Sequence, residues 1–360
     1  MIRIPDHLRA LAPYVPGKQV EEVERQLGIR DAVKLASNEN PLGPSPRAIE
    51  AIRNSASRVH RYPEGSGYAL RRALSTKLGV PDSQIVLGNG STELVEIIAK
   101  TFLAGGQGAV VADQAFIMYR LAVQGMNAPL EVVPLKDHRH DLRRMASACD
   151  ERTALVYIAN PNNPTGTYVT RDEAKTYFEL LPPHVLTVID EAYLDYVDAP
   201  DCADALSFLK SGRPLVVLRT FSKIYGLAGL RIGYAATVKE VASAMEAVRS
   251  PFNTSITAQA AAQAALDDID HVARSRAENG RWLRFLQDEL VRRRIEFIPS
   301  VANFVLVRTG IRGEELFQRL LRLGVIVRPM EAYGYADAVR VSVGTREEIE
   351  RFLTALDQTL

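Results

Sequence analysis

The chain has 360 residues, which is long enough for a large buried core and, on size alone, for two domains. Apolar residues make up 47% and charged residues 24%, a globular composition that argues against disorder. The 44 basic and 43 acidic residues leave a net charge of +1, so the charge gives no reason to expect nucleic acid or an anionic membrane as a partner.

Cysteine and histidine usage and the first residues of the chain predict a cytoplasmic protein without a metal. Cys149 and Cys202 have no metal-binding spacing and are expected to be free thiols. The six histidines show no paired ligand spacing. Residues 1–9 lack the basic start and apolar run of a secretory signal, and no apolar stretch approaches the ~20 residues that span a bilayer.

The N-terminal part is expected to be an arm over residues 1–40. It begins with a proline-rich stretch, in which Pro13 and Pro16 flank Tyr14, and a short helical patch follows. Residues 37–46 contain three prolines and must be extended or turned.

From about residue 67 to residue 266, short apolar runs alternate with helical stretches. This alternation predicts an α/β fold with a mostly parallel sheet and helices on both of its faces. In such sheets, ligands bind beyond the carboxyl ends of the strands. The expected strands are Gln84–Leu87, Gly108–Ala112, Ala154–Ile158, Leu186–Ile189, Leu215–Leu218 and Arg231–Ala235. The expected helices are Ser91–Leu103, Arg171–Leu180, Lys239–Val248 and Thr257–Leu266.

The pattern changes after residue 266. A long charged helix, Val272–Arg294, precedes three short strands, Asn303–Val307, Val325–Val327 and Val339–Val343. We therefore expect a large domain over residues 41–266 and a smaller α+β domain over residues 267–360. The N-terminal arm is expected to pack on the small domain or on a partner subunit.

The most informative segment is residues 218–233, a strand end followed by a loop that carries Lys223. Thr220 and Ser222 supply hydroxyls near this lysine, and Arg231 supplies a cation eight positions after it. Such a set suits a phosphate held beside a Schiff-base amine. A lysine in a loop is more often a solvated surface residue, so the spacing alone leaves both interpretations open.

An acidic residue, Asp190, ends another apolar run. A carboxylate in that position should face a ligand or a cation, and opposite a pyridine nitrogen it would keep that nitrogen protonated. Tyr193, three residues later, could present its hydroxyl to the same ring. The alternative for Asp190 is an ordinary helix cap.

Two further polar segments follow apolar runs. Residues 160–166 have the composition of a turn, although a side-chain amide held between prolines can bond a phenolic oxygen. Residues 88–93 offer glycines, hydroxyls and a helix N-terminus to an anion, and they are equally consistent with a plain helix start. A nucleotide site is not indicated, because Glu93 stands where a G-x-G-x-x-G pattern needs its third glycine.

These motifs together give a resemblance that covers essentially the whole chain. The chain resembles the fold-type I aminotransferases that depend on pyridoxal 5'-phosphate (PLP). The motifs Asn-Pro-Thr-Gly (163–166), Asp-x-x-Tyr (190–193) and Ser-Lys-x-x-x-Leu-x-Gly-Leu-Arg (222–231) are together highly specific for that fold. Within it, the chain most resembles the histidinol-phosphate aminotransferases, through residues 13–18, 35–41, 61–63, 327–329 and 340–344.

The resemblance implies PLP as the cofactor and a role for each residue near its ring. Lys223 would bind the cofactor covalently and later shuttle a proton. Asp190 would pair with the pyridine nitrogen, while Asn163 and Tyr193 would bond the phenolic oxygen. Phe116 would stack on the ring.

The resemblance also implies how the cofactor phosphate is held. Tyr62 would reach across the interface of a homodimer to the phosphate of the neighbouring subunit. Within the subunit, the phosphate would be held by Ser91, Thr92, Ser222 and Arg231.

The substrates implied are histidinol phosphate and 2-oxoglutarate, or imidazole-acetol phosphate and glutamate in the physiological direction. Arg328 and Arg340 would receive the anionic end of the substrate, and Tyr14 and Asn40 would line that pocket. Many relatives have Pro-Thr or Pro-His where this chain has Gln114-Ala115, which changes the loop beside the stacking ring.

The sequence is compatible with other functions. An aromatic amino-acid aminotransferase of the same branch shares nearly every motif, and a threonine-phosphate decarboxylase uses the same cofactor. A transcription regulator with an aminotransferase-like domain is disfavoured, because the enzyme pattern begins almost at residue 1. A non-catalytic binding protein is disfavoured because Lys223, Asp190 and Arg231 are all present.

Overall fold

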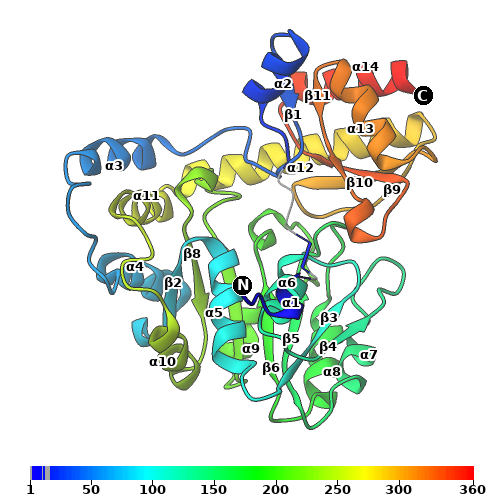
Figure 1. The fold of residues 1–360 in the computed structure, drawn as a ribbon. Helices are drawn as coiled ribbons and strands as arrows, with labels where there is room; N and C mark the ends of the chain where they lie inside the picture. Colours follow the sequence, from blue (N-terminus) through cyan, green and yellow to red (C-terminus); the bar gives the residue numbers. More distant parts are fainter. Residues whose placement is uncertain (1, 10, 13–16) are drawn as a thin grey trace.

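The computed structural model describes residues 2–9, 11–12 and 17–360. Tyr14, predicted to line the substrate pocket, lies outside these residues. Figure 1 shows a large sheet with its helices below a smaller sheet, and helix α12 (Ile269–Arg292) runs from one part to the other.

The large part is built on a seven-stranded sheet in the order β2-β8-β7-β6-β5-β3-β4. Only β8 runs against its neighbours, and the other pairs are parallel. The prediction of a mostly parallel sheet is therefore confirmed. The strands are β2 (Ile85–Gly88), β3 (Gly108–Ala112), β4 (Leu130–Val133), β5 (Thr153–Ala159), β6 (Leu186–Asp190), β7 (Leu215–Thr220) and β8 (Gly233–Ala236).

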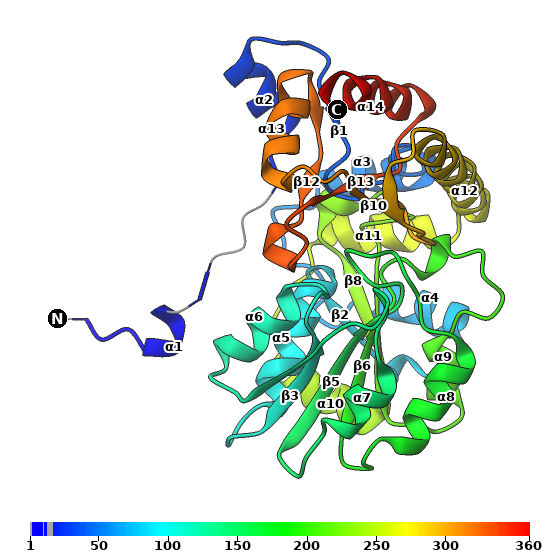
Figure 2. The same ribbon diagram turned by 90° about the vertical axis from the view of Figure 1, so that its right-hand side faces the viewer.

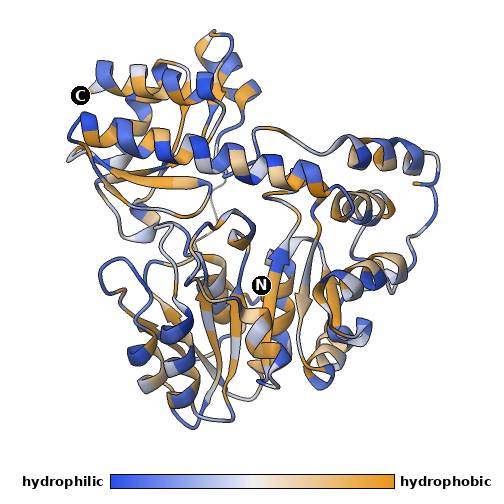
Figure 3. Ribbon diagram, turned by 180° about the vertical axis from the view of Figure 1, so that it is seen from behind, coloured by the Kyte–Doolittle hydropathy of each residue, from blue (hydrophilic) through white to orange (hydrophobic). Residues whose placement is uncertain are grey.

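Helices cover both faces of this sheet, as expected from strands that are apolar throughout. Side chains alternate along a strand, so Val156 and Ile158 belong to one buried cluster while Leu155 and Tyr157 belong to another. The first cluster contains α3 (Pro46–Ala56), α4 (Tyr68–Leu78), α7 (Leu142–Ser147), α8 (Arg171–Leu180), α9 (Ala205–Lys210) and α11 (Ile256–Leu266). The second contains α5 (Gly90–Phe102), α6 (Met118–Gly125) and α10 (Lys239–Val248). Figure 3 shows hydrophobic strands and helices that are hydrophobic along one stripe.

The smaller part is a four-stranded antiparallel sheet in the order β12-β13-β10-β9, packed against α12 and two further helices of the described residues. Its elements are β9 (Glu296–Ile298), β10 (Phe304–Arg308), α13 (Gly313–Arg322), β12 (Arg328–Pro329), β13 (Ala338–Ser342) and α14 (Arg346–Thr359). A capping box formed by Thr345 and Glu348 starts α14, in the same way that Thr170 and Glu173 start α8.

The N-terminal segment divides between the two parts. Strand β1 (Val33–Lys34) pairs in parallel with β11 (Val325–Ile326), and α2 (Val20–Leu27) buries Val23 in the core of the smaller sheet. Helix α1 (Asp6–Arg9) instead contacts α6, and Figure 2 shows it set apart from α2. Short 3-10 helices complete the structure at Asp82–Gln84, Leu194–Tyr196, Ala228–Leu230 and Glu331–Tyr333. None of the described helices has the length and apolar character that crossing a membrane requires.

The topology brings the predicted motifs to one edge of the large sheet. Strands β2, β5, β6 and β7 run in the same direction, so their carboxyl ends lie at that edge. Because β8 is antiparallel, it begins there, and Arg231 lies two residues before its first residue, Gly233. Four segments far apart in the sequence, residues 88–93, 160–166, 190–193 and 218–233, therefore meet beneath the smaller sheet.

Candidate active site

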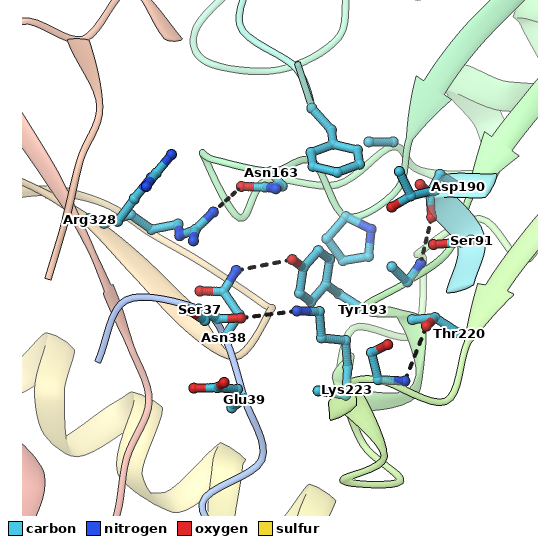
Figure 4. A pocket seen from close by; sticks show the side chains of 18 of the residues that line it. Ser37, Asn38, Glu39, Ser91, Asn163, Asp190, Tyr193, Thr220, Lys223 and Arg328 are labelled. Atoms are coloured by element: carbon cyan, nitrogen blue, oxygen red, sulfur yellow. Dashed lines mark hydrogen bonds between the residues drawn. The ribbon is translucent and has the colours of Figure 1, made fainter. Parts of the chain in front are cut away.

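A cavity of about 270 Å³ lies at this edge, between the large sheet and the smaller one. Apart from Tyr14, which is outside the described residues, every predicted site residue except Asn40 and Tyr62 lines it. Figure 4 shows the central group: Lys223, Tyr193 and Asp190 approach from the large sheet, while Asn38 and Arg328 face them from the other side.

Lys223 projects into the middle of the cavity from the loop after β7. Its Nζ donates a hydrogen bond to the Ser37 carbonyl (3.1 Å) and lies 5.6 Å from the centre of the Tyr193 ring. Burial, and next the nearby Arg340 cation, lower the pKa of the Lys223 amine to about 7. A large fraction of the amine is therefore neutral near pH 7, as nucleophilic attack on an aldehyde requires.

Asp190 is a buried carboxylate at the floor of the cavity. Its Oδ2 accepts a hydrogen bond from the Tyr119 hydroxyl (2.9 Å), and its Oδ1 accepts one from the Ala192 backbone (3.1 Å). Among the described residues, the charged neighbour that lowers the pKa of Asp190 is the Lys223 amine, which forms no hydrogen bond with it. Burial raises the pKa of Asp190 to about 6, although both hydrogen bonds favour the ionised form. Such a carboxylate suits a protonated pyridine nitrogen, which would supply the missing positive partner.

A hydrogen-bond network closes the cavity on the side of the smaller sheet. Arg340, which is buried, donates to Asn163 Oδ1 (2.5 Å) and to the Ala36 carbonyl (2.8 Å), while its Nε has no partner among the described residues. The Tyr193 hydroxyl accepts a hydrogen bond from Asn38 Nδ2 (3.0 Å). Arg340 thus has donor capacity left for an anion in the cavity.

The N-terminus of α5 forms an anion-binding end of the cavity. Its N-cap residue Asn89 makes no side-chain capping bond, which leaves first-turn N–H groups for a ligand. Arg231 lies against this helix start so closely that a Cβ at Gly90 would overlap its Nη2. The same guanidinium donates to Ser222 Oγ (3.2 Å). This cradle of backbone amides, hydroxyls and a cation fits a phosphate monoester.

The residues present therefore fit PLP at each of its polar groups. Ser91, Thr92, Ser222 and Arg231 would hold its phosphate, and Asp190 would face its ring nitrogen. Phe116 lines the cavity and packs edge-on against Tyr119, and its stacking on the cofactor ring stays a prediction. Bound there, PLP would supply an electron sink beside the Lys223 amine.

Two predicted residues lie elsewhere. The Asn40 amide donates to the Ile224 carbonyl (2.8 Å) and to Ser275 Oγ (3.0 Å), so it faces away from the cavity and we drop it from the substrate pocket. Tyr62 is 81% exposed and stacks on Phe252, outside the cavity. Its predicted role across a dimer interface stays a prediction.

Several residues that line the cavity were not among the predicted site residues, and Tyr119 and Asn38 are two of them. Tyr119 lies on the buried face of α6, where it resembles an ordinary apolar residue, and Asn38 lies in the segment between β1 and α3. The polar partners of both residues are distant in sequence, and no local pattern indicates them.

The chain is similar to known aminotransferases in both sequence and structure. The family model of aminotransferase class I and II matches residues 30–356. The chain is 47% identical over 359 residues to a histidinol-phosphate aminotransferase of Anaeromyxobacter sp. (strain Fw109-5), covering 99% of each chain. It is 48% identical over 353 residues to histidinol-phosphate aminotransferase 1 of Nitrosococcus oceani, covering 98% of this chain and 95% of that one. Among solved structures, the chain is similar to the histidinol-phosphate aminotransferase of Sinorhizobium meliloti in complex with PLP, with a TM-score of 0.90. The two chains are 29% identical, and the match covers 100% of this chain and 98% of that one.

Proposed function

The chain belongs to the class I and II aminotransferases and, among them, to the histidinol-phosphate aminotransferases, and we propose the following reaction for it. It is a PLP-dependent enzyme that transfers the amino group of histidinol phosphate to 2-oxoglutarate, giving imidazole-acetol phosphate and glutamate. In the physiological direction glutamate is the donor, and the reaction serves histidine biosynthesis.

The observation that carries this proposal is a cavity with two anion-binding ends and a lysine between them. Ser91 and Arg231 lie at one end, and Arg328 and Arg340 lie at the other, as Figure 4 shows for Ser91 and Arg328. The first end would hold the cofactor phosphate, and the second would receive the substrate. Guanidinium groups bind both phosphate monoesters and carboxylates, so one pocket can accept histidinol phosphate and glutamate in turn.

The residues near Lys223 divide the chemical work. Lys223 would take the proton from the α-carbon of the substrate and pass it on to the cofactor, and in the second half of the reaction it would carry out the same transfer in reverse. Asp190 would keep the ring nitrogen protonated, so that bound PLP can accept the electron pair left at that carbon. Asn163 and Tyr193 would bond the phenolic oxygen and fix the tilt of the ring.

The test is a half-reaction followed at the visible absorbance of the bound cofactor. We expect histidinol phosphate to convert the aldehyde form of the cofactor to its amine form, and 2-oxoglutarate to restore it with release of glutamate. Phenylalanine and threonine phosphate serve as competing substrates. Conversion by phenylalanine without conversion by histidinol phosphate would favour an aromatic amino-acid aminotransferase, and release of CO₂ from threonine phosphate would favour a decarboxylase.

A Lys223→Ala variant checks the cofactor assignment separately. We expect it to lose the visible band of the covalently bound cofactor and to transaminate at least a thousandfold more slowly. If the wild-type protein showed no visible band even after addition of PLP, both the cofactor and the reaction would be wrong.

We further propose that the enzyme acts as a homodimer in which Tyr62 reaches the cofactor phosphate of the partner subunit. In support, exposed apolar side chains gather near Tyr62, among them Val59 and Phe252, and the shallow pocket that they line also contains Arg231. Light scattering should give the mass of a dimer, and a monomer would contradict the proposal. The division into domains at residues 41–266 and 267–360 and the cytoplasmic location stay predictions.

A further inference from the structure

Asn38 is held by four hydrogen bonds at the junction of the two sheets. Its backbone N–H donates to Ser342 Oγ (2.8 Å), and its carbonyl accepts from Asn303 Nδ2 (3.0 Å). Its side-chain oxygen accepts from Ser342 Oγ (3.0 Å), and its Nδ2 donates to the hydroxyl of Tyr193 (3.0 Å). The residue is 1% exposed, and its side chain reaches Tyr193 on the large part of the molecule (Figure 4).

These bonds define which way the Asn38 amide points. Ser342 Oγ lies beside the oxygen, and Tyr193 lies beside the nitrogen. A serine hydroxyl has one proton, so it can donate to the Asn38 oxygen while its lone pairs accept the Asn38 backbone N–H. The amide is therefore left with its nitrogen as a donor toward Tyr193, and Tyr193 must accept there.

From this geometry, and resting on the proposed function, we propose that Asn38 is a positioning residue that directs the Tyr193 hydroxyl proton toward the phenolic oxygen of the cofactor. A tyrosine hydroxyl carries a single proton. Because Asn38 occupies an acceptor position of the oxygen, that proton stays available for the cofactor. Asn38 thereby makes Tyr193 a donor to the ring.

The surroundings of Tyr193 are consistent with a neutral phenol that keeps its proton. Burial raises the pKa of Tyr193, so it is not ionised at physiological pH. The charged groups that face it are Lys223, Arg340 and Asp190. All three stay unchanged when Asn38 is replaced, so a change in the titration of the cofactor can be traced to Asn38 and Tyr193.

The backbone conformation of Asn38 restricts which residue types can stand at this position. Its φ of 54° lies in the left-handed region, where asparagine is the most tolerated residue after glycine. The strain is accepted at a buried residue whose backbone N–H and carbonyl are bonded to the side chains of Ser342 and Asn303. Glycine would satisfy the backbone equally well, but it would lack the amide that reaches Tyr193.

The experiment replaces the donor by an acceptor of the same shape, in the variant Asn38→Asp, and measures the pH midpoint of the visible absorbance of bound PLP. With a carboxylate beside it, Tyr193 donates to the carboxylate and no longer to the phenolic oxygen. The phenolic oxygen of the cofactor then lacks one hydrogen-bond donor. The proton whose loss changes the visible absorbance is therefore held more strongly by the cofactor, and we expect the midpoint to rise by about one pH unit. An unchanged midpoint would overturn the proposal.

The new negative charge could by itself raise the midpoint, and two controls separate this effect. Asn38→Asp is repeated in a Tyr193→Phe background, where the proposal predicts that most of the shift disappears. A shift of full size in that background would show that charge alone is responsible and would refute the role of the hydroxyl. Asn40→Asp makes the same substitution two residues away, in contact with Ile224 and Ser275 but not with Tyr193, and should leave the midpoint in place.

If Asn38→Asp does not bind PLP, Asn38→Ala takes its place, because it removes the donor without adding charge. The proposal predicts a smaller shift in the same direction, and no shift contradicts it. Failure of the inference is distinguishable from failure of the proposed function. A wild-type protein that binds PLP and converts histidinol phosphate, together with Asn38 variants of unchanged midpoint, refutes only the inference.

Discussion

The hydrogen bond between Tyr119 and Asp190 gives a prediction that needs neither substrate nor cofactor. Both side chains are buried, and the Tyr119 hydroxyl lies 2.9 Å from Asp190 Oδ2. Replacing Tyr119 by Phe removes one donor to the carboxylate and keeps the ring that stacks on Tyr157. We expect this substitution to destabilise the protein more at pH 8 than at pH 5.

The magnitude follows from the two charge states of Asp190. A hydrogen bond to a charged group contributes about 1.5–3 kcal/mol, and a neutral one contributes about 0.5–1.5 kcal/mol. The loss of Tyr119 should therefore penalise the ionised form by roughly 1.4 kcal/mol more than the protonated form. That difference corresponds to a further rise of about one unit in the pKa of Asp190, beyond the value of about 6 that burial already causes.

The direction with pH follows from linkage. The pKa of Asp190 in the folded protein lies above the ~3.9 of an unfolded chain, so Asp190 costs stability once the pH rises through the folded value. Below about pH 5 the carboxyl is protonated in both proteins, and the substitution removes only a neutral hydrogen bond. The extra cost of about 1.4 kcal/mol develops as the pH passes through about 6 and 7, and is complete near pH 8.

The assay is urea unfolding of the cofactor-free protein at pH 5 and pH 8, with the difference between wild type and variant taken at each pH. Tyr157→Phe is the matched control. Tyr157 is equally buried and stacks on Tyr119, but its hydroxyl lies 3.4 Å from the Val95 carbonyl and has no bond to Asp190. Its cost should be the same at both pH values. An equal cost of Tyr119→Phe at pH 5 and pH 8 would refute the reasoning.

Two further substitutions test the two anion-binding ends of the cavity. Arg340→Lys keeps the charge but loses the planar guanidinium that bonds Asn163 and Ala36. The KM for histidinol phosphate should therefore rise by about tenfold or more, while the affinity for PLP changes little. An unchanged KM would exclude Arg340 from substrate binding. Gly90→Ala places a methyl group against Arg231 Nη2 at a residue with φ of 77°, so the affinity for PLP in a fluorescence titration should fall about tenfold. Gly229→Ala, where a Cβ meets no atom within 4 Å, should leave that affinity unchanged, and similar losses in both variants would contradict the proposed cradle.

The elements that the sequence predicted well have strong local signals. Helices α8 and α10 have the expected bounds, and β3 does too. Strand β4 was not predicted, because it lies at the edge of the sheet and only Val133 is buried, so it lacks a continuous apolar run. The strand expected from Arg231 begins instead at Gly233. Arg231 has a φ of 54°, which ends the preceding turn and aims its side chain at α5.

The prediction of Asn40 and the omission of Asn38 have one physical cause. In an extended segment, residues two apart share a face, so Asn38 and Asn40 would both line the cavity. The left-handed conformation of Asn38 breaks this alternation, and Asn40 turns toward Ile224 and Ser275 instead. A sequence pattern carries only a faint indication of such a conformation, since asparagine tolerates it without requiring it. The bonds that impose it come from Asn303 and Ser342, more than 260 residues along the chain, and only the assembled fold brings them together.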